Sequence, residues 1–136
     1  MKGHVLDANA LYRFLMNQPG ADVVESVLKR ARDANVTLLM SVINWGEVYY
    51  NIAVKRGFKE AQAFMGRVRL LPLSLISADE PITEIAAQLK AGYGLPYADC
   101  FAAAITGKDN VLVTADVKDF KKVPWLHILP LPPYQP

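Results

Sequence analysis

The sequence predicts an α/β fold in which a parallel β-sheet is flanked by helices. Short apolar segments of strand length alternate along the chain with longer segments of helical periodicity. The strand segments are apolar at nearly every position, which is typical of parallel strands that are covered on both faces. Since the chain shows no repeat, linker or low-complexity stretch, we expect a single domain over residues 1–136.

The composition agrees with a folded globular domain. The chain has 136 residues, of which 52% are hydrophobic and 21% are charged, so it can bury a core without disulfides and is not disordered. The formal net charge of +2 permits a nucleic-acid partner without requiring one. Cys100 is the single cysteine and is expected to be a small buried side chain.

No apolar run reaches the roughly 18 residues of a membrane span. Asp7 stands where a signal peptide would need its apolar stretch. We therefore expect a cytoplasmic protein that does not associate with membranes.

The first elements follow from short apolar runs and helical spacing. Residues 4–6 form an apolar run that predicts a strand, and the amphipathic stretch after it predicts a helix that ends before Pro19. Residues 21–35 carry apolar side chains at helical spacing and a basic last turn, which suits the negative end of the helix dipole. Residues 36–40 are apolar and partly β-branched, which predicts the second strand.

The middle of the chain predicts two helices and a strand. Ser41 is expected to cap a helix that ends near Gly57, where glycine permits the left-handed conformation. The buried face of this helix is predicted from its apolar positions: Val42, Trp45, Val48, Tyr49 and Ile52. A second helix is expected over residues 58–69, followed by a strand over 71–76.

The remainder of the chain predicts two more helices and two strands. Ser77 and Glu80 have capping-box spacing at the start of a helix that ends near Gly92. Pro96 opens the next helix, and strands are expected over residues 111–114 and 127–129. The segment over 124–136 holds five of the nine prolines and is interpreted as a Pro-rich tail, either extended along the domain or loose.

Carboxylates follow two of the predicted strands. Asp7 comes directly after the first strand, and Asp116 lies two residues beyond Thr114, where a later strand ends. Because functional groups gather at the carboxyl ends of parallel strands, these two side chains are candidates for one pocket. Taken alone, either residue could equally be a helix N-cap.

Two further acids stand in apolar segments. Glu47 lies close to the buried face of its helix, and Asp99 lies in a first turn. An unpaired buried carboxylate is costly, so each needs a partner, a capping role or a metal. A solvated position for Glu47 and an interaction of Asp99 with the helix dipole remain alternatives. As a set, the four acids suit Mg²⁺ or Mn²⁺, which prefer oxygen ligands.

Competing catalytic motifs are absent from the sequence. The chain contains no GxGxxG, no GxxxxGK[ST] and no HExxH motif. A haloacid-dehalogenase-like phosphatase would need a second Asp two residues after the first, where this chain has Asn9.

Four segments carry a common pattern in order, namely residues 5–9 (Val-Leu-Asp-Ala-Asn), 41–48, 97–104 and 112–120. Together they resemble the PIN-domain ribonucleases, and in particular the VapC toxins of prokaryotic VapBC toxin–antitoxin modules. The resemblance implies a three-layer α/β/α sandwich with a central parallel sheet.

The resemblance also implies a set of site residues. The acids that would bind one or two Mg²⁺ or Mn²⁺ ions and act in catalysis are Asp7, Glu47, Asp99 and Asp116. Asn9 and Thr114 match positions that help to order the site. Asp119 matches a further acid that lies near the metal in some members, and its alternative role is to cap the short turn over residues 116–120.

The implied function is that of a metal-dependent endoribonuclease that leaves a 5′-phosphate and is the toxic component of a type II toxin–antitoxin system. A VapB-like antitoxin is implied as partner, held by helices around residues 10–65 and reaching the acidic pocket with an Arg or Lys. A homodimer is implied as well. The alternative is a catalytically inert PIN-like module that binds RNA or protein.

RNA would need cationic contacts for its phosphates and aromatic side chains for its bases. The candidate cations are Arg13, Lys118, Lys121 and Lys122. The candidate stacking residues are Tyr12, Tyr93 and Tyr97. Each of these has an ordinary alternative role, as a solvated charge or as part of the core.

Overall fold

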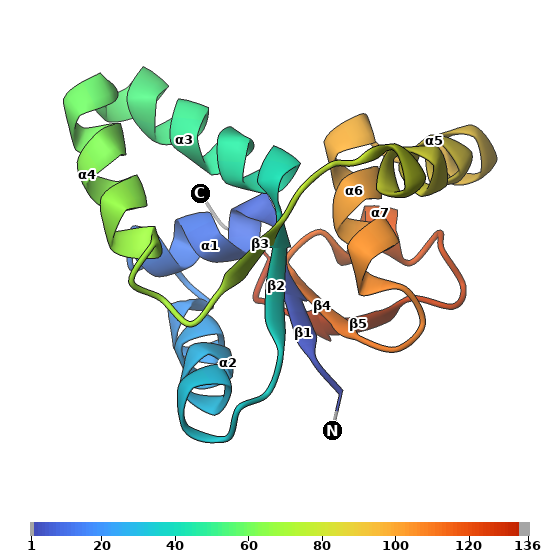
Figure 1. Cartoon of the computed structure of the whole chain (residues 1–136), viewed down its shortest axis with the longest axis horizontal. Coiled ribbons are helices and arrows are strands. Elements are labelled where there is room, and N and C mark those ends of the chain that lie inside the picture. Colours follow the sequence, from blue (N-terminus) through green and yellow to red (C-terminus); the bar gives the residue numbers. More distant parts are fainter. Residues whose placement is uncertain (1, 134–136) are drawn as a thin grey trace.

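The computed structural model describes residues 2–133, which form a five-stranded sheet with helices on both sides (Figure 1). The strand order is β3-β2-β1-β4-β5, and every pairing is parallel. The strands are β1 (His4–Leu6), β2 (Leu38–Ser41), β3 (Ser74–Ile76), β4 (Val111–Thr114) and β5 (His127–Pro130). The predicted α/β class with a parallel sheet is confirmed.

The helices form two layers. One face of the sheet is covered by α1 (Ala8–Leu15), α2 (Ala21–Asp33), α3 (Val42–Arg56) and α4 (Phe58–Val68). The other face is covered by α5 (Glu80–Tyr93), α6 (Tyr97–Thr106) and α7 (Val117–Phe120). The three-layer α/β/α sandwich is therefore confirmed.

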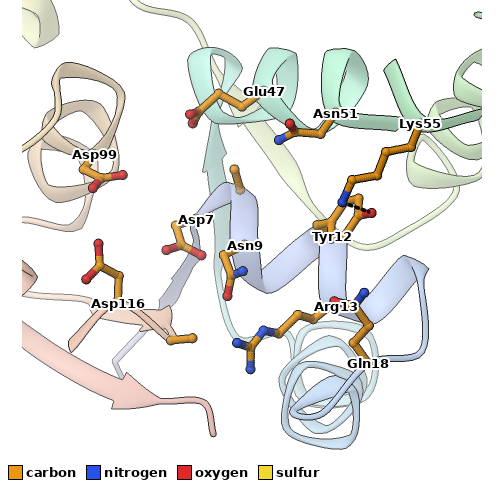
Figure 2. A pocket seen from close by; sticks show the side chains of 12 residues that line it. Asp7, Asn9, Tyr12, Arg13, Gln18, Glu47, Asn51, Lys55, Asp99 and Asp116 are labelled. Atoms are coloured by element: carbon orange, nitrogen blue, oxygen red, sulfur yellow. Dashed lines mark hydrogen bonds between the residues drawn. The ribbon is translucent and has the colours of Figure 1, made fainter. Parts of the chain in front are cut away.

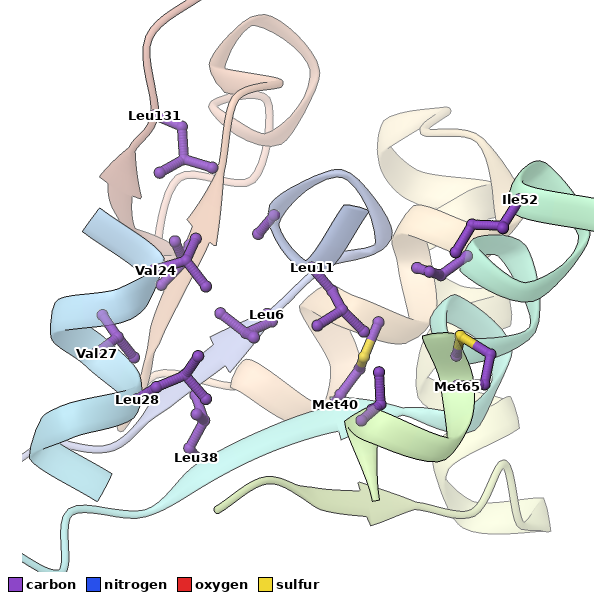
Figure 3. Close-up of a cluster of buried hydrophobic side chains, with 14 of the residues drawn as sticks. Leu6, Leu11, Val24, Val27, Leu28, Leu38, Met40, Ile52, Met65 and Leu131 are labelled. Atoms are coloured by element: carbon purple, nitrogen blue, oxygen red, sulfur yellow. The ribbon is translucent and has the colours of Figure 1, made fainter. Parts of the chain in front are cut away.

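The central strands supply both halves of the core. Leu6 and Val113 pack with the helices α1 to α4, in the cluster that Figure 3 shows around Leu6, Leu11 and Met40. Val5 and Leu112 pack with α5 and α6 on the opposite face. Because successive side chains of a strand point to opposite faces, a strand buried on both faces must be apolar throughout.

The strand order creates a switch point beside β1. The chain passes from β1 to β2 and β3 on one side and then returns to β4 and β5 on the other. The loops after β1 and β4 therefore diverge at the carboxyl ends of the strands, where α/β sheets form a crevice. Asp7 directly follows β1, and Asp116 follows β4.

Several predicted boundaries are wrong by a few residues. The second strand begins at Leu38 rather than at residue 36, because its register with β1 starts where His4 pairs with Leu38. The helix α5 is capped by Asp79, which accepts a hydrogen bond from the Ile82 amide at 3.0 Å, and not by Ser77. Val42 was expected on a buried face but is 36% exposed.

The C-terminal segment lies along the domain. β5 extends the sheet beside β4, and Leu131 beyond it is buried. The last residues of the predicted tail, 134–136, lie outside the described residues. Across residues 2–133, none of the helices combines the length and the apolar character that crossing a membrane would require.

Candidate metal centre

All four predicted acids line one cavity of about 610 Å³ at the carboxyl edge of the sheet. Figure 2 shows them converging from separate elements at one end of this cavity. The lining residues are Asp7, Ala8, Asn9, Tyr12, Arg13, Gln18, Glu47, Asn51, Lys55, Asp99, Ala115 and Asp116. The fold thus brings together side chains that are separated by up to 109 positions in the sequence.

Asp7 combines a capping role with a place in the cavity. Its Oδ1 accepts a hydrogen bond from the Ala10 amide at 2.8 Å and so caps α1. Its Oδ2 accepts a hydrogen bond from the Thr114 hydroxyl at 2.5 Å. Burial nevertheless raises the pKa of Asp7 to about 6, because the two hydrogen bonds do not offset the loss of solvent.

Thr114 connects the carboxylates that follow the two central strands. Its Oγ1 donates to Asp7 and accepts a hydrogen bond from the Asp116 amide at 2.9 Å, and the residue is fully buried. Asp116 in turn caps α7 by accepting from the Asp119 amide at 3.2 Å, and burial raises its pKa. The capping interpretation and the pocket interpretation are therefore both correct for Asp7 and Asp116.

Asp99 and Glu47 reach the cavity from helices on opposite faces of the sheet. Burial, together with the charges of Asp7, Asp116 and Glu47, raises the pKa of Asp99 to about 7. Glu47 is oriented by Asn44, whose Nδ2 donates to Oε1 of Glu47 at 2.9 Å.

Asn44 is a site residue that the sequence reasoning missed. Its Nδ2 also donates to the Ala98 carbonyl at 3.2 Å, which ties α3 to the first turn of α6 beside Asp99. The side chain is fully buried, and its position three residues before Glu47 on the same helix was the available signal.

The donor set fits a hard divalent cation. Carboxylate oxygens of Asp99, Asp116 and Asp119 lie within 4.8 Å of one another. Asp119 also pairs with Lys122 at 3.2 Å, and this contact lowers the pKa of Asp119. These donors are all oxygens, which suits Mg²⁺ or Mn²⁺, and a cation there would relieve the repulsion that raises the pKa of Asp99.

The structure places Arg13 in the lining of the cavity and buries it there. The residue is 2% exposed, so it is not a solvated charge. The guanidinium donates to the Pro19 carbonyl at 3.0 Å and to the Pro132 carbonyl. Arg13 is buried because the C-terminal segment passes over α1, a packing that local sequence does not reveal.

The other predicted RNA contacts lie at different places. Tyr12 lines the cavity, whereas the three lysines do not: Lys118, Lys121 and Lys122 lie on or just after α7. Asn9, the residue expected to help order the site, also lines the cavity. Tyr97 packs edge-on against Phe101 with ring centroids 5.1 Å apart, and Tyr93 packs against the core beneath α5 and α6.

A known domain family matches most of the sequence. The sequence model of the PIN domain matches residues 4–126. No curated protein matches the chain significantly.

Solved toxin–antitoxin structures have a similar fold. VapBC2 from Rickettsia felis, bound to a DNA fragment from its promoter, is similar with a TM-score of 0.76, 20% identity and coverage of 95% of this chain and 98% of that one. DNA-bound VapBC from Salmonella typhimurium gives a TM-score of 0.75, 19% identity and coverage of 96% and 98%.

A more distant likeness is to VapC20 from Mycobacterium tuberculosis, a toxin that cleaves the sarcin-ricin loop. Its TM-score is 0.54 at 16% identity, over 76% of this chain and 81% of that one. At such identities these likenesses show the fold alone. Because the PIN domain model spans most of the sequence, we conclude that this chain belongs to the PIN domain family.

Proposed function

We propose that this protein is an endoribonuclease that depends on Mg²⁺ or Mn²⁺ and hydrolyses phosphodiester bonds of RNA. One observation carries the proposal: Asp7, Glu47, Asp99 and Asp116 converge at one end of a cavity whose volume is ordinary for a ligand site. The charges of Asp7, Asp116 and Glu47 add to burial in raising the pKa of Asp99, and a cation bound there would relieve this repulsion. Membership of the PIN domain family supports the same chemistry.

The residues would have different roles according to where they lie in the cavity. Asp99 and Asp116, together with Asp119, present the closest group of ligand oxygens, and Asp7 and Glu47 complete the acidic end of the cavity. A bound divalent cation supplies Lewis acidity toward a phosphoryl oxygen and lowers the pKa of water. Thr114 and Asn44 hold Asp7 and Glu47 in place through their hydrogen bonds.

The reaction we propose is hydrolysis with inversion at phosphorus. The oxygen of water forms a bond to phosphorus while the bond from phosphorus to the 3′ oxygen breaks. The carboxylates of the acidic cluster take up the proton that water loses, and solvent water supplies a proton to the leaving 3′ oxygen. The products are a 3′-hydroxyl and a 5′-phosphate.

We further propose that the protein is the toxic component of a type II toxin–antitoxin system. The support is that similar structures are VapBC complexes, which this chain matches over nearly the full length of both chains. The proposed partner is a VapB-like antitoxin, and the proposed assembly is a homodimer. Helices α1 to α4 supply the surface we assign to the antitoxin.

Cleavage of a broad RNA panel tests the enzymatic proposal. We expect Mg²⁺ or Mn²⁺ to support cleavage with 5′-phosphate ends, and excess EDTA to abolish it. Asp7→Asn and Asp99→Asn should lower kcat/KM by about a hundredfold or more, since they remove groups that hold the cation. Asp109→Asn, an exposed aspartate in the turn after α6, is the matched control and should keep full activity.

Two results would count against this function. Full metal-dependent cleavage by Asp7→Asn would show that the acids are wrongly assigned. If the intact protein cleaved no RNA in the panel, the inert binding module would be the better description.

Induced expression in bacterial cells tests the toxin proposal separately. We expect growth arrest with the intact protein, normal growth with Asp7→Asn, and rescue when a small protein encoded directly upstream is expressed as well. Active cleavage in vitro without any growth arrest would contradict the toxin role while leaving the nuclease in place.

A further inference from the structure

The cavity has a second end that the proposed hydrolysis does not use. Tyr12, Asn51 and Lys55 line it there, away from the four acids (Figure 2). We call these three residues the distal subsite. They come from α1 and α3, the same helices that begin beside Asp7 and carry Glu47.

The spacing along α3 places this subsite at a defined distance from the acids. Glu47, Asn51 and Lys55 are four residues apart in succession, so they lie along one face of the helix. With a rise of 1.5 Å per residue, the backbone at Lys55 is about 12 Å along the axis from that at Glu47. One helix face therefore runs from an acidic end of the cavity to a cationic end.

Lys55 is held in position by an aromatic ring. Its Nζ donates to the Tyr12 hydroxyl at 3.0 Å and lies 4.8 Å from the centroid of the same ring. The ion pairs among residues 2–133 do not include Lys55. By contrast, the adjacent Arg56 pairs with Glu60 at 3.8 Å. The ammonium of Lys55 thus keeps donors for an outside acceptor, since it has three N–H groups.

The charge balance of the cavity indicates which acceptor would bind. A chain of phosphates that enters an acidic cavity needs a counter-charge for each phosphate held there. A cation bound at the four acids would supply the counter-charge for the phosphate that is cleaved. Of the two basic residues in the lining, Arg13 is buried and bonded to carbonyl oxygens, which leaves Lys55. Asn51 adds an exposed amide that can donate to a phosphate oxygen.

We propose that Tyr12, Asn51 and Lys55 bind a phosphate of the RNA strand that flanks the hydrolysed one, with Lys55 as the phosphate contact and Tyr12 as the residue that positions it. This inference rests on the proposed ribonuclease function. It requires a minimum length of substrate, because the RNA must reach from the acids to Lys55.

Salt-dependent binding is the sharpest test. The probe is a fluorescently labelled single-stranded RNA, measured by anisotropy in an Asp99→Asn background, where we expect cleavage to be slower by about a hundredfold or more. Adding Lys55→Met should weaken binding roughly two- to fivefold, as for one exposed ionic contact. It should also reduce the slope of log Kd against log salt concentration by about 0.7, the value for one phosphate on a single strand.

Matched variants show whether RNA binding depends on where the lysine charge lies or only on the total charge of the protein. Lys108→Met removes the same charge from an exposed lysine in the turn before β4, at the opposite edge of the sheet, and should bind like its parent. Lys55→Arg should restore the slope. Tyr12→Phe removes only the hydroxyl that accepts from Lys55 and should weaken binding less than Lys55→Met, with an unchanged melting temperature.

Cleavage of a length series of RNA oligonucleotides gives a second readout. With the native acids present, Lys55→Met should lower kcat/KM on long oligonucleotides but not on those too short to reach the distal subsite. If the native protein cleaves RNA and Lys55→Met matches Lys108→Met in both assays, the subsite is wrong and the proposed function stands. If the native protein neither binds nor cleaves RNA, both proposals fail together.

Discussion

At the scale of single residues, Asp7 shows how one side chain can serve structure and chemistry together. It ends a buried strand, caps the first helix and accepts a hydrogen bond from Thr114. It remains 4% exposed inside an acidic cavity, and burial raises its pKa to about 6. The stabilisation from the cap therefore coexists with an electrostatic cost that a bound cation would remove.

We predict that Thr114→Val removes the hydrogen-bonded link between the Asp7 carboxylate and the backbone of Asp116. The change leaves Oδ2 of Asp7 without a donor and the Asp116 amide without an acceptor, each of which is costly in a buried position. Activity should fall by about ten- to a hundredfold and the free energy of unfolding by about 1–3 kcal/mol.

The control for this change is Thr106→Val, which removes a buried hydroxyl that bonds only within α6, to the Ala102 carbonyl. Urea unfolding should show a comparable loss of stability in Thr106→Val, while RNA cleavage by it should be retained. Equal loss of activity in the two variants would mean that Thr114 acts on the fold alone.

We predict that Asp99→Asn stabilises the metal-free protein in a pH-dependent way. The folded state holds the Asp99 proton up to a pKa of about 7, whereas the unfolded chain releases it near 3.8. The unfolded state therefore binds fewer protons between these pH values, so this carboxyl lowers stability progressively as pH rises from about 4 to about 7. Below pH 4 the carboxyl is neutral in both states.

Urea unfolding of the metal-free protein and of Asp99→Asn, compared across this pH range, is the measurement. The variant should match the native protein at pH 4 and exceed it increasingly toward pH 7, with Asp109→Asn as the control. A constant difference across the range would contradict the assigned environment of Asp99.

At the scale of elements, the path of the C-terminal segment depends on the turn between α1 and α2. Gly20 has a φ of 97°, in the left-handed region that disfavours a side chain. A Cβ there would lie 3.2 Å from the Leu131 Cβ and 3.2 Å from the Pro132 Cδ. The Arg13 guanidinium donates a hydrogen bond to the Pro132 carbonyl of the same segment.

We therefore predict that Gly20→Ala destabilises the protein by about 1–2 kcal/mol, from backbone strain and close contact with the C-terminal segment. Gly66→Ala is the matched control, because Gly66 lies within α4 and a Cβ there meets nothing within 4 Å. Thermal melting should show that Gly66→Ala is more stable than the native protein by roughly 0.5–1 kcal/mol, the usual gain of Ala over Gly in a helix. Equal shifts in the two variants would contradict the close approach at Gly20.

At the scale of the whole molecule, the distribution of charge matters more than its sum. The formal net charge is only +2, from 15 basic and 13 acidic residues. Four of the acids line one cavity together with Arg13 and Lys55, which leaves nine acids against 13 basic residues elsewhere. The rest of the protein is consequently more basic than the total suggests, which favours a polyanionic partner.

We predict that a divalent cation stabilises the fold as a whole. A ligand that binds only the native state raises stability by about 2.7 kcal/mol at a hundred times its Kd. The melting temperature at pH 7 should rise with Mg²⁺ or Mn²⁺ concentration, and the rise should be lost in Asp99→Asn. NaCl at matched ionic strength is the control, and an equal rise with NaCl would indicate general screening instead of a site.

The sequence by itself determined the α/β class, the order of the elements apart from the short helix α7, and the acids that share a cavity. Apolar runs and helical spacing are local properties, and parallel strands bring their carboxyl ends to one edge whatever the register. Hence Asp7 and Asp116 could be paired without knowing the structure.

Only the tertiary structure decided the contacts between elements. The hydrogen bond from Asn44 to Ala98, the burial of Arg13 beneath the C-terminal segment and the contact of Lys55 with Tyr12 each join residues on different elements. A residue's own neighbours in the sequence show which face of a helix is apolar but not which distant segment covers it. Those partners are set by how the helices pack across the sheet, because packing depends on the shapes of all the side chains at once.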